Sequence, residues 1–357
     1  MNTGSTILTV LSLASAPAHA QPSDGSSASS GPKVSGFIDT TFNYNANRPK
    51  SGKNTFFSYS AQHNNFSVNT ADVSLSGSVE GLSYYVQVDA GSDAVVNSFA
   101  YSTGTIFDLQ EAYAQYTSPS KWGVKVGKFV TYHGIELIES GSDPTISRGF
   151  LFGLAEPATH VGGVATYQAT PEVDIALGLI NGWDLFADNN KFKMAVAKVG
   201  INLGDPLGLT LSSYAGPDQA NNTDNWRTTF DVTGVSKQGA TTINFQGNFG
   251  FEQQATMTAE DDLWFGFGIQ PVFKLDDQVS LGLRGEMFYD DKGSRGGVPA
   301  GASLFDLTIT PGYLVTPSFL VRGEARLDVS NKDAFEAHDG TATSSQLVGM
   351  VEALASF

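Results

Sequence analysis

Residues 318–329 read SFLVRGEARLDV, and the two faces of this stretch decide the fold class. Every second residue from Phe319 to Val329 is apolar or small, and the residues between them include Arg322, Glu324, Arg326 and Asp328. A period of two residues is the pattern of a β-strand whose two faces meet different surroundings. Because a charged side chain is costly against lipid, the charged row is predicted to line a water-filled lumen and the apolar row to face lipid.

The same alternation recurs from Val34 to the C-terminus in segments of about ten residues. In residues 34–45, VSGFIDTTFNYN, Ile38 and Phe42 share one face and Asp39 lies on the other. Later segments begin near residues 66, 82, 106, 121, 161, 172, 192, 206, 225, 239, 262, 278, 303, 318 and 344. The total of about sixteen strands is an even number within the range of outer-membrane barrels.

The connections between these segments alternate between short turns and long polar loops. The short ones contain Pro, Gly and Asp, which preset or tolerate a tight backbone. They are Glu80-Gly81, Ser118-Pro119-Ser120, Thr170-Pro171, Gly204-Asp205-Pro206, Lys237-Gln238-Gly239, Leu275-Asp276-Asp277 and Thr316-Pro317-Ser318. The long ones fall around residues 46–65, 92–105, 130–160, 182–191, 217–224, 252–261, 291–302 and 330–343. This strict alternation is the periplasmic and extracellular asymmetry of a bacterial outer-membrane barrel, and a soluble β-sandwich does not show it.

Composition agrees with this fold. Charged residues make up 16% of the 357 residues, against about 25% in an average soluble domain. No mature segment approaches the ~20 consecutive apolar residues of a membrane-spanning helix. The 36 acidic and 20 basic residues give a net charge of −16, which argues against a nucleic-acid partner. We therefore predict one all-β domain, a transmembrane antiparallel up-and-down β-barrel without helices.

The N-terminus is predicted to direct export. Residues 5–17 form an apolar run too short to span a membrane, and Ala18-His19-Ala20 fits a cleavage site. We predict a signal peptide over residues 1–20, a flexible Ser/Gly/Pro leader over residues 21–33 and the barrel over residues 34–357, in the bacterial outer membrane. A disordered start is the alternative for the first segment.

The last segment, residues 344–357, alternates up to the terminal Phe357. A terminal strand that pairs with the first one leaves no open sheet edge in lipid, where unpaired backbone groups are intolerable. A C-terminal phenylalanine in such a strand also resembles the insertion signal of outer-membrane proteins. The predicted partners are therefore the barrel-insertion machinery, outer-membrane lipid and lipopolysaccharide.

The alternation assigns charged residues of other segments to the lumen as well. Val86 and Val88 are predicted to face lipid, so Gln87 and Asp89 are predicted to point into the lumen. The same reasoning gives a predicted lumen lining of Asp89, Lys121, Lys125, Arg284, Glu286, Asp306, Arg322, Glu324 and Arg326.

Four motifs resemble a known family. They are FDLQEAYAQYT (107–117), GKFVTYHGIELIES (127–140), SRGFLFGLAEPATHVGGVATY (147–167) and GLINGWDLFADNNKFKMAVAKV (178–199). These stretches resemble the putative outer-membrane β-barrel porin family, OmpL-like branch, and the last third of the chain matches by pattern only. The resemblance implies an outer-membrane barrel with a pore function, and it does not fix a substrate.

The connection over residues 130–160 is far longer than the usual two to six residues, and it is too apolar to be disordered. It is the third long loop, and in general porins, to which this arrangement is similar, that loop folds into the lumen. Phe150, Leu151 and Phe152 are costly to leave in water, so packing on the inner wall is expected. The predicted pore constriction comprises Glu136, Glu139, Asp143, Arg148, Glu156 and His160. A loop that caps the barrel outside or packs on a neighbouring subunit is the alternative.

Other motifs favour structural roles. Ser147 with His160 could be drawn as a hydrolase, but no third orienting group stands at a defined spacing. Residues 181–190, NGWDLFADNN, could offer calcium oxygen ligands at 184, 188 and 189, but they lack the EF-hand spacing, so turn chemistry is favoured. Acidic residues at 260–262 and 290–291 could bridge divalent cations to lipopolysaccharide, and a solvated rim is favoured. No catalytic residue, resident metal or cofactor is predicted, with a loop-bound divalent cation as the alternative.

The sequence thus predicts a passive diffusion porin for ions and small hydrophilic solutes, narrowed by loop 130–160. The excess of acidic residues predicts a mild preference for cations, which the lumen arginines oppose. The alternative is a plugged structural or adhesive outer-membrane barrel, and an outer-membrane hydrolase is third. Whether the barrel forms a homotrimer stays open at this point.

Overall fold

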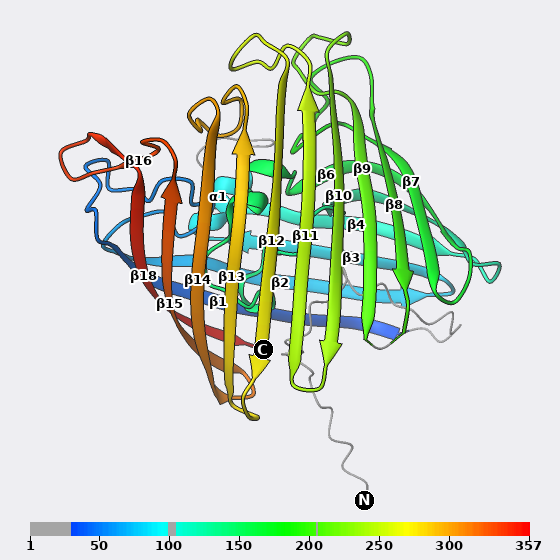
Figure 1. Ribbon diagram of the computed structural model, residues 1–357. Coiled ribbons are helices and arrows are strands. Elements are labelled where there is room, and N and C mark those ends of the chain that lie inside the picture. Colours follow the sequence, from blue (N-terminus) through cyan, green and yellow to red (C-terminus); the bar gives the residue numbers. More distant parts are fainter. Residues whose placement is uncertain (1–29, 99–104, 205) are drawn as a thin grey trace, which may run out of the picture.

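The computed structural model describes residues 30–98, 105–204 and 206–357. Sixteen strands form a closed barrel (Figure 1). They are β1 (Ser30–Asn45), β2 (Asn65–Val79), β3 (Leu82–Ala90), β4 (Phe107–Thr117), β5 (Trp122–Val130), β6 (Thr159–Gln168), β7 (Val173–Ile180), β8 (Met194–Asn202), β9 (Leu207–Pro217), β10 (Trp226–Gln238), β11 (Thr241–Glu252), β12 (Asp262–Lys274), β13 (Val279–Asp290), β14 (Ala302–Thr316), β15 (Phe319–Ser330) and β18 (Ser345–Ser356). The predicted signal peptide, residues 1–20, and leader residues 21–29 lie outside the described residues.

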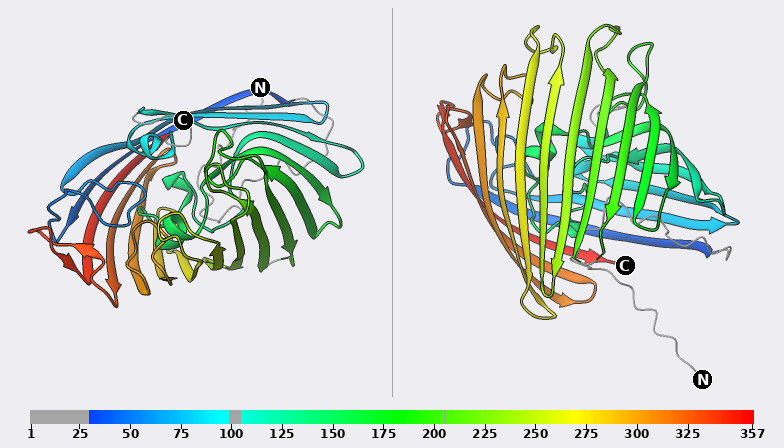
Figure 2. Two further views of the ribbon diagram at one scale, coloured as in Figure 1. Left: turned by 90° about the horizontal axis from the view of Figure 1, so that it is seen from above. Right: turned by 45° about the vertical axis from the view of Figure 1, so that its right-hand side comes forward.

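Each strand pairs antiparallel with its neighbours in the chain, and β18 pairs with β1 to close the ring (Figure 2, left). Two further two-residue strands, β16 (Phe335–Glu336) and β17 (Ala342–Thr343), form a separate hairpin in the last long connection. At the junction, Phe357 and Gly36 exchange backbone hydrogen bonds of 3.0 and 3.2 Å. Closure satisfies the backbone groups that an open edge would expose, so the predicted up-and-down barrel is confirmed.

The two faces of the strands also follow the prediction. In β15, Leu327 is 40% exposed, whereas Arg326 beside it is fully buried. In β1, Ile38 is exposed and Asp39 is buried. We call the buried side chains of the barrel strands the buried row. It is mostly polar, whereas the exposed row is mostly apolar, as expected for a barrel with lipid outside.

The short turns lie at or next to the predicted positions, over residues 80–81, 118–121, 169–172, 203–204 and 206, 239–240, 275–278 and 317–318. Asp205 of the fourth turn lies outside the described residues, and the predicted turn residues Lys237 and Gln238 belong to the end of β10. In the first turn, Glu80 and Gly81 both adopt positive φ, 49° and 84°. We call this side of the barrel the short-turn end and the opposite side the long-loop end.

The structure corrects three details of the prediction. β1 begins at Ser30, so residues 30–33 belong to the barrel and not to the leader. Lys121 lies in a turn with φ of 69° and is exposed, because the strand starts only at Trp122. Short helical segments occur where no helix was predicted: α1 (Ser92–Asn97), η2 (Ser140–Ser142) and η3 (Leu151–Ala155). Helices this short are marginal alone and depend on tertiary packing, which local sequence does not reveal.

Among the described helices, none has the length and apolar content needed to cross a membrane.

Candidate functional site

Loop 3, the connection over residues 131–158 between β5 and β6, makes most of its contacts with the buried row of the wall. Its hydrogen-bond partners in the strands lie on β9, β10, β11, β12, β13, β15 and β18, and Glu139 also bonds to Gln87 of β3. A long segment without a strand ladder must satisfy its backbone groups by other means. The side chains of the wall do this, and they determine the path of the loop.

Arg322 on β15 holds the middle of loop 3. Its guanidinium binds both carboxylate oxygens of Glu352, at 2.6 and 2.9 Å. It also donates to the carbonyl oxygen of Asp143 at 2.6 Å and to Ser140, at 2.9 Å to the carbonyl oxygen and 2.7 Å to Oγ. Arg322 is 4% exposed and Glu352 is 1% exposed. A two-pronged pair of this kind is both strong and geometrically specific.

Arg284 on β13, two strands from β15 in the barrel, makes a similar arrangement. Its Nε and Nη2 each bond to Asp306 at 3.0 Å. Its Nη1 reaches loop 3, with contacts of 2.8 Å to Glu136 Oε1 and 2.5 Å to the carbonyl oxygen of Ser147. The guanidinium groups of both arginines therefore donate hydrogen bonds to carboxylates of the wall and to acceptors of loop 3.

Carboxylates of the wall bind the loop backbone in the opposite sense. Glu324 accepts the N–H of Ile146 at 2.6 Å, and Glu286 accepts the N–H of Leu151 at 3.1 Å. Charge-assisted bonds to backbone N–H groups are shorter and stronger than neutral ones. The chain between the two anchored residues is thus fixed against β13 and β15.

Arg148 braces the loop internally. It donates to the carbonyl oxygens of Leu137 and Ile146, both at 2.8 Å, and lies 3.2 Å from Asp143. Its own carbonyl oxygen accepts a bond of 2.6 Å from Arg326 of β15. The outward and returning halves of loop 3 are therefore tied together and to the wall.

Apolar packing secures the helical part of loop 3. Phe150, Leu151 and Leu154 form one buried cluster with Trp264 of β12 and Phe288 of β13. Burying each large apolar side chain contributes roughly 1.5–3 kcal/mol. Phe150 and Leu151 thus pack against side chains of β12 and β13, whereas Phe152 lies in a separate cluster with Tyr59, Val130 and Ile138.

His133 secures the start of the loop. Its ring nitrogens lie 2.7 Å from Ser212 Oγ and 2.9 Å from Thr229 Oγ1. Its ring packs edge-on against Tyr214, whose other neighbour is the ring of His160, each at 4.6 Å between centroids. Burial, with His160 nearby, holds the pKa of His133 well below its usual value. The imidazole is therefore neutral and structural.

The structure gives the six predicted constriction residues two kinds of surroundings. Glu139 is half-buried, and its Oε1 accepts a bond of 3.1 Å from Gln87. The others are buried among wall and loop groups: Glu136, Asp143, Arg148, Glu156 and His160. Glu156, for example, accepts a bond of 2.7 Å from Gln246. These five side chains are enclosed by groups of the loop and of the wall.

The residues predicted to line the lumen divide similarly. Asp89 and Lys125 lie on the buried row of β3 and β5, and Gln87 connects Asp89 to Glu139 of loop 3. We call the wall side chains that bond to loop 3, together with their paired charges, the anchoring network. The anchoring network takes up most of the others: Arg284, Glu286, Asp306, Arg322, Glu324 and Arg326. Lys121 belongs neither to the buried row nor to the anchoring network, since it lies in a short turn.

Sequence reasoning missed several tyrosines and one lysine. Tyr85 of β3, Tyr113 of β4 and Tyr132 of loop 3 are half-buried, as is Lys198 of β8. The rings of Tyr85 and Tyr113 lie 5.7 Å apart. The alternation of their strands could have placed the first two inward, but tyrosine is also typical of the lipid interface, so residue type did not point to the lumen.

The alternative sites have ordinary structural partners. Ser147 Oγ bonds to Arg284 at 3.0 Å, while His160 Nδ1 lies 3.3 Å from the carbonyl oxygen of Gly182. Asp184 accepts the N–H groups of Ala158 and Thr159 at 2.7 and 2.9 Å. Burial raises the pKa of Asp184 to about 6. The described residues contain no group of three or more His, Asp or Glu arranged to hold a metal ion.

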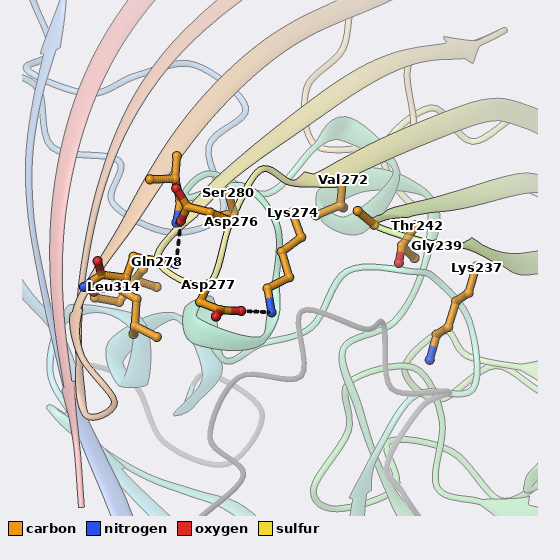
Figure 3. Close-up of a pocket in the computed structure, with 13 residues that line it drawn as sticks. Lys237, Gly239, Thr242, Val272, Lys274, Asp276, Asp277, Gln278, Ser280 and Leu314 are labelled. Atoms are coloured by element: carbon orange, nitrogen blue, oxygen red, sulfur yellow. Dashed lines mark hydrogen bonds and ion pairs between the residues drawn. The ribbon is translucent and has the colours of Figure 1, made fainter.

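A cavity of about 340 Å³ lies at the short-turn end (Figure 3). Its lining includes Thr242, Val272 and Leu314, with the exposed pair Lys274 and Asp277, whose Nζ and Oδ1 are 3.0 Å apart. Exposed ion pairs contribute little binding energy. The anchored loop and the wall opposite it are therefore the better candidate site.

Comparison with known proteins agrees with the fold. Residues 31–357 match the model of the family described as Putative beta-barrel porin-2, OmpL-like. No curated protein matches the chain.

Solved structures with a similar fold include three bacterial porins and channels. The anion-selective porin from Comamonas acidovorans has a TM-score of 0.64 at 10% identity, with 92% of this chain and 100% of that chain covered. The outer membrane channel DcaP of Acinetobacter baumannii has a TM-score of 0.62 at 11% identity, with 91% and 97% covered. OmpT of Vibrio cholerae has a TM-score of 0.61 at 15% identity, with the same coverage. At these identities the likeness shows the fold alone, whereas the family match spans the whole barrel. The chain therefore belongs to the Putative beta-barrel porin-2, OmpL-like family of outer-membrane β-barrel porins.

Proposed function

We propose that the protein is a passive diffusion channel for ions and small hydrophilic solutes, in which loop 3 lies inside the barrel and narrows it. The solute path runs between residues 132–139 of loop 3 and the wall formed by β2 to β8. The observation that carries this proposal is the uneven anchoring of the loop. Most of its bonds to the strands go to β9–β13, β15 and β18, whereas Glu139 bonds to Gln87 of β3, and the tyrosines of β3 and β4 stay half-buried.

Alternation within loop 3 supports this path. His133, Glu136 and Ile138 are buried, whereas Leu137 and Glu139 between and after them are half-buried. The half-buried side chains of this segment point away from its packed side. Residues 132, 135, 137 and 139 then form the loop side of the aperture.

The alternative, a plugged barrel, requires this face to be filled. The hydroxyl groups of Tyr113 and Tyr132 have no protein partner in the described part of the chain, and they are not enclosed. This favours an open path.

Planar-bilayer recording tests the proposal, and the absence of cysteine from the sequence makes thiol labelling specific. Glu139→Cys, treated with a bulky charged methanethiosulfonate, is expected to lose single-channel conductance because the adduct enters the aperture. Glu260→Cys on the connection between β11 and β12 is the matched control and should label without effect. Deletion of residues 135–150 should widen the conductance.

Two results would contradict the proposal. If the purified protein gave no conductance steps, the proposal that it forms a channel would be refuted. If Glu139→Cys were fully labelled and the conductance stayed unchanged, the proposal that loop 3 narrows the path would be refuted.

Finer properties remain proposals of the same kind. The net charge of −16 supports a mild cation preference, which the reversal potential in a salt gradient measures. One solved form of OmpT is described as a trimer, and a homotrimer of this chain is testable by native mass in detergent. Export through residues 1–20, recognition of Phe357 by the insertion machinery and contact with lipopolysaccharide are proposed on the sequence alone.

A further inference from the structure

Three half-buried tyrosines lie on the wall of β3 and β4 and at the start of loop 3. Tyr85 of β3 and Tyr113 of β4 have ring centroids 5.7 Å apart. The ring of Tyr132, on loop 3, lies 6.2 Å from that of Phe129. Tyr113 and Tyr132 both pack against one buried apolar cluster that includes Phe129. We call Tyr85, Tyr113 and Tyr132 the tyrosine belt.

The belt lies on an apolar floor inside the barrel. The buried row is mostly polar elsewhere, but on β6, β7 and β8 it includes Val164, Ala176 and Val196, which are 1%, 4% and 2% exposed. These side chains belong to the cluster against which Tyr113 and Tyr132 pack. Apolar groups inside a barrel that carries water are costly unless they are covered. The floor therefore covers part of each tyrosine ring, and the remainder of the ring is available to a solute.

Backbone contacts hold Tyr132 in place. Its N–H donates to the hydroxyl oxygen of Tyr214 at 2.7 Å, and its carbonyl oxygen accepts a bond of 3.0 Å from Ser212 Oγ. Both partners belong to β9. Because both backbone groups of Tyr132 are bonded to the wall, its ring is carried on a fixed support. A surface that is already ordered loses little entropy when a solute binds to it.

The lysines next to the belt have compensating partners. Lys198 Nζ lies 3.0 Å from Asp174 Oδ1. Lys125 Nζ lies 4.3 Å from the centroid of the Tyr113 ring, and the Glu111 carboxylate attracts it. The positive charge beside the belt is therefore compensated, and the ring faces of the tyrosines are left to distinguish one uncharged solute from another.

The belt also offers hydroxyl groups. The hydroxyl of Tyr85 donates to Gln87 Oε1 at 3.2 Å and lies 3.1 Å from Ser74 Oγ. The hydroxyls of Tyr113 and Tyr132 bond to no protein group in the described ranges 30–98, 105–204 and 206–357, and they are not enclosed. A solute at the belt can therefore contact a ring face and bond to a hydroxyl group at the same time.

We propose that the tyrosine belt favours the passage of uncharged solutes with a hydroxyl-bearing ring, the class of cyclic monosaccharides, over open-chain polyols of the same size. The proposal rests on the proposed function, since a solute must pass the belt. A pyranose ring has C–H groups on its faces and hydroxyl groups at its edge, so it can cover a tyrosine ring and bond to its hydroxyl. An open-chain polyol has similar hydroxyl groups but no flat face.

Glucose and sorbitol are the matched solutes, because they have the same number of carbon atoms, both are uncharged and only glucose forms a ring. The charge of the nearby Glu139 acts on both alike. Uptake of each labelled solute into proteoliposomes is measured at low concentration and normalised to uptake of glycerol. Burial of roughly 40 Å² of C–H surface corresponds to about a fivefold change in an equilibrium constant, so wild-type protein should admit glucose about fivefold faster than sorbitol.

Substitutions in the belt test its ring faces. Tyr113→Leu and Tyr132→Leu should each lower the ratio of glucose to sorbitol uptake by up to about fivefold, because leucine has no flat face. A wider aperture would speed both solutes, so it cancels in this ratio. Tyr113→Phe should keep more of the ratio than Tyr113→Leu, since the ring remains. Tyr116→Leu is the matched control and should keep the wild-type ratio, because Tyr116 lies on the same strand and is 39% exposed on the lipid face.

The outcomes distinguish the two proposals. If wild-type protein gives neither glycerol uptake nor conductance steps, the proposed function is refuted and this inference with it. If glycerol uptake is normal and glucose and sorbitol enter at equal rates, the ring selectivity alone is refuted. The same holds if Tyr113→Leu and Tyr132→Leu fold, as heat-modifiable migration shows, and keep the wild-type ratio.

Discussion

Replacing Arg322 by leucine is predicted to release loop 3 from the wall while the barrel stays closed. The change removes the bonds to Ser140 and Asp143 and leaves Glu352, which is 1% exposed, without its countercharge. Removal of one partner from a buried ion pair costs about 3–5 kcal/mol. The strand ladders are untouched, so we expect the cost to appear as local opening of loop 3, favoured by roughly a hundredfold to a few thousandfold.

Tryptic cleavage after Arg148 measures this opening. Arg148 is 3% exposed in loop 3, so wild-type protein in detergent should resist cleavage there. Arg322→Leu should be cleaved faster by the factor given above, and it should still migrate as a compact barrel before boiling. Arg48→Leu, a change of an exposed arginine in the first long connection, is the matched control. If Arg148 stays as protected in Arg322→Leu as in the wild type, the Arg322 pair does not hold the loop.

Three further predictions concern the same loop and the barrel seam. A methyl group at Gly282 would lie 2.2 Å from the carbonyl oxygen of Pro144, so Gly282→Ala should displace loop 3 and raise the noise of the open-channel current. Gly323→Ala is the control, because its methyl group meets nothing within 4 Å. Equal current noise in the two variants would refute this prediction. Burial lowers the pKa of His133, so the released loop binds a proton more readily than the anchored one. The free energy of loop anchoring should therefore decrease as pH falls below about 6.5, by up to about 1.4 kcal/mol per pH unit. The rate of tryptic cleavage in loop 3 measures this decrease. The same pH dependence in His133→Gln would contradict the prediction. Deletion of Phe357 removes the backbone pair that extends the closing seam, so folding into micelles, followed by heat-modifiable migration, should slow; an unchanged rate would show that the seam closes without it.

Much of the barrel could be predicted because its information is local. The alternation in residues 318–329 assigned Arg322 and Arg326 to one face and Leu327 to the other, and the structure agrees. Turn residues such as Glu80-Gly81 marked the ends of strands, since a tight turn demands particular residues. The prediction for Lys121 was wrong because periodicity does not mark the residue at which a strand begins.

The sequence by itself determined an antiparallel transmembrane barrel, the charged and apolar faces of its strands, and an oversized third connection. Only the tertiary structure decided which charges meet: Arg322 and Ser140 are 182 residues apart in the chain, and no periodicity relates them. It also separated residues that had looked equivalent, since Glu136 is enclosed with Arg284 whereas Glu139 is half-buried. The physical reason is that β-alternation is fixed by each residue's own backbone, whereas the surroundings of a loop side chain depend on which distant strands face it.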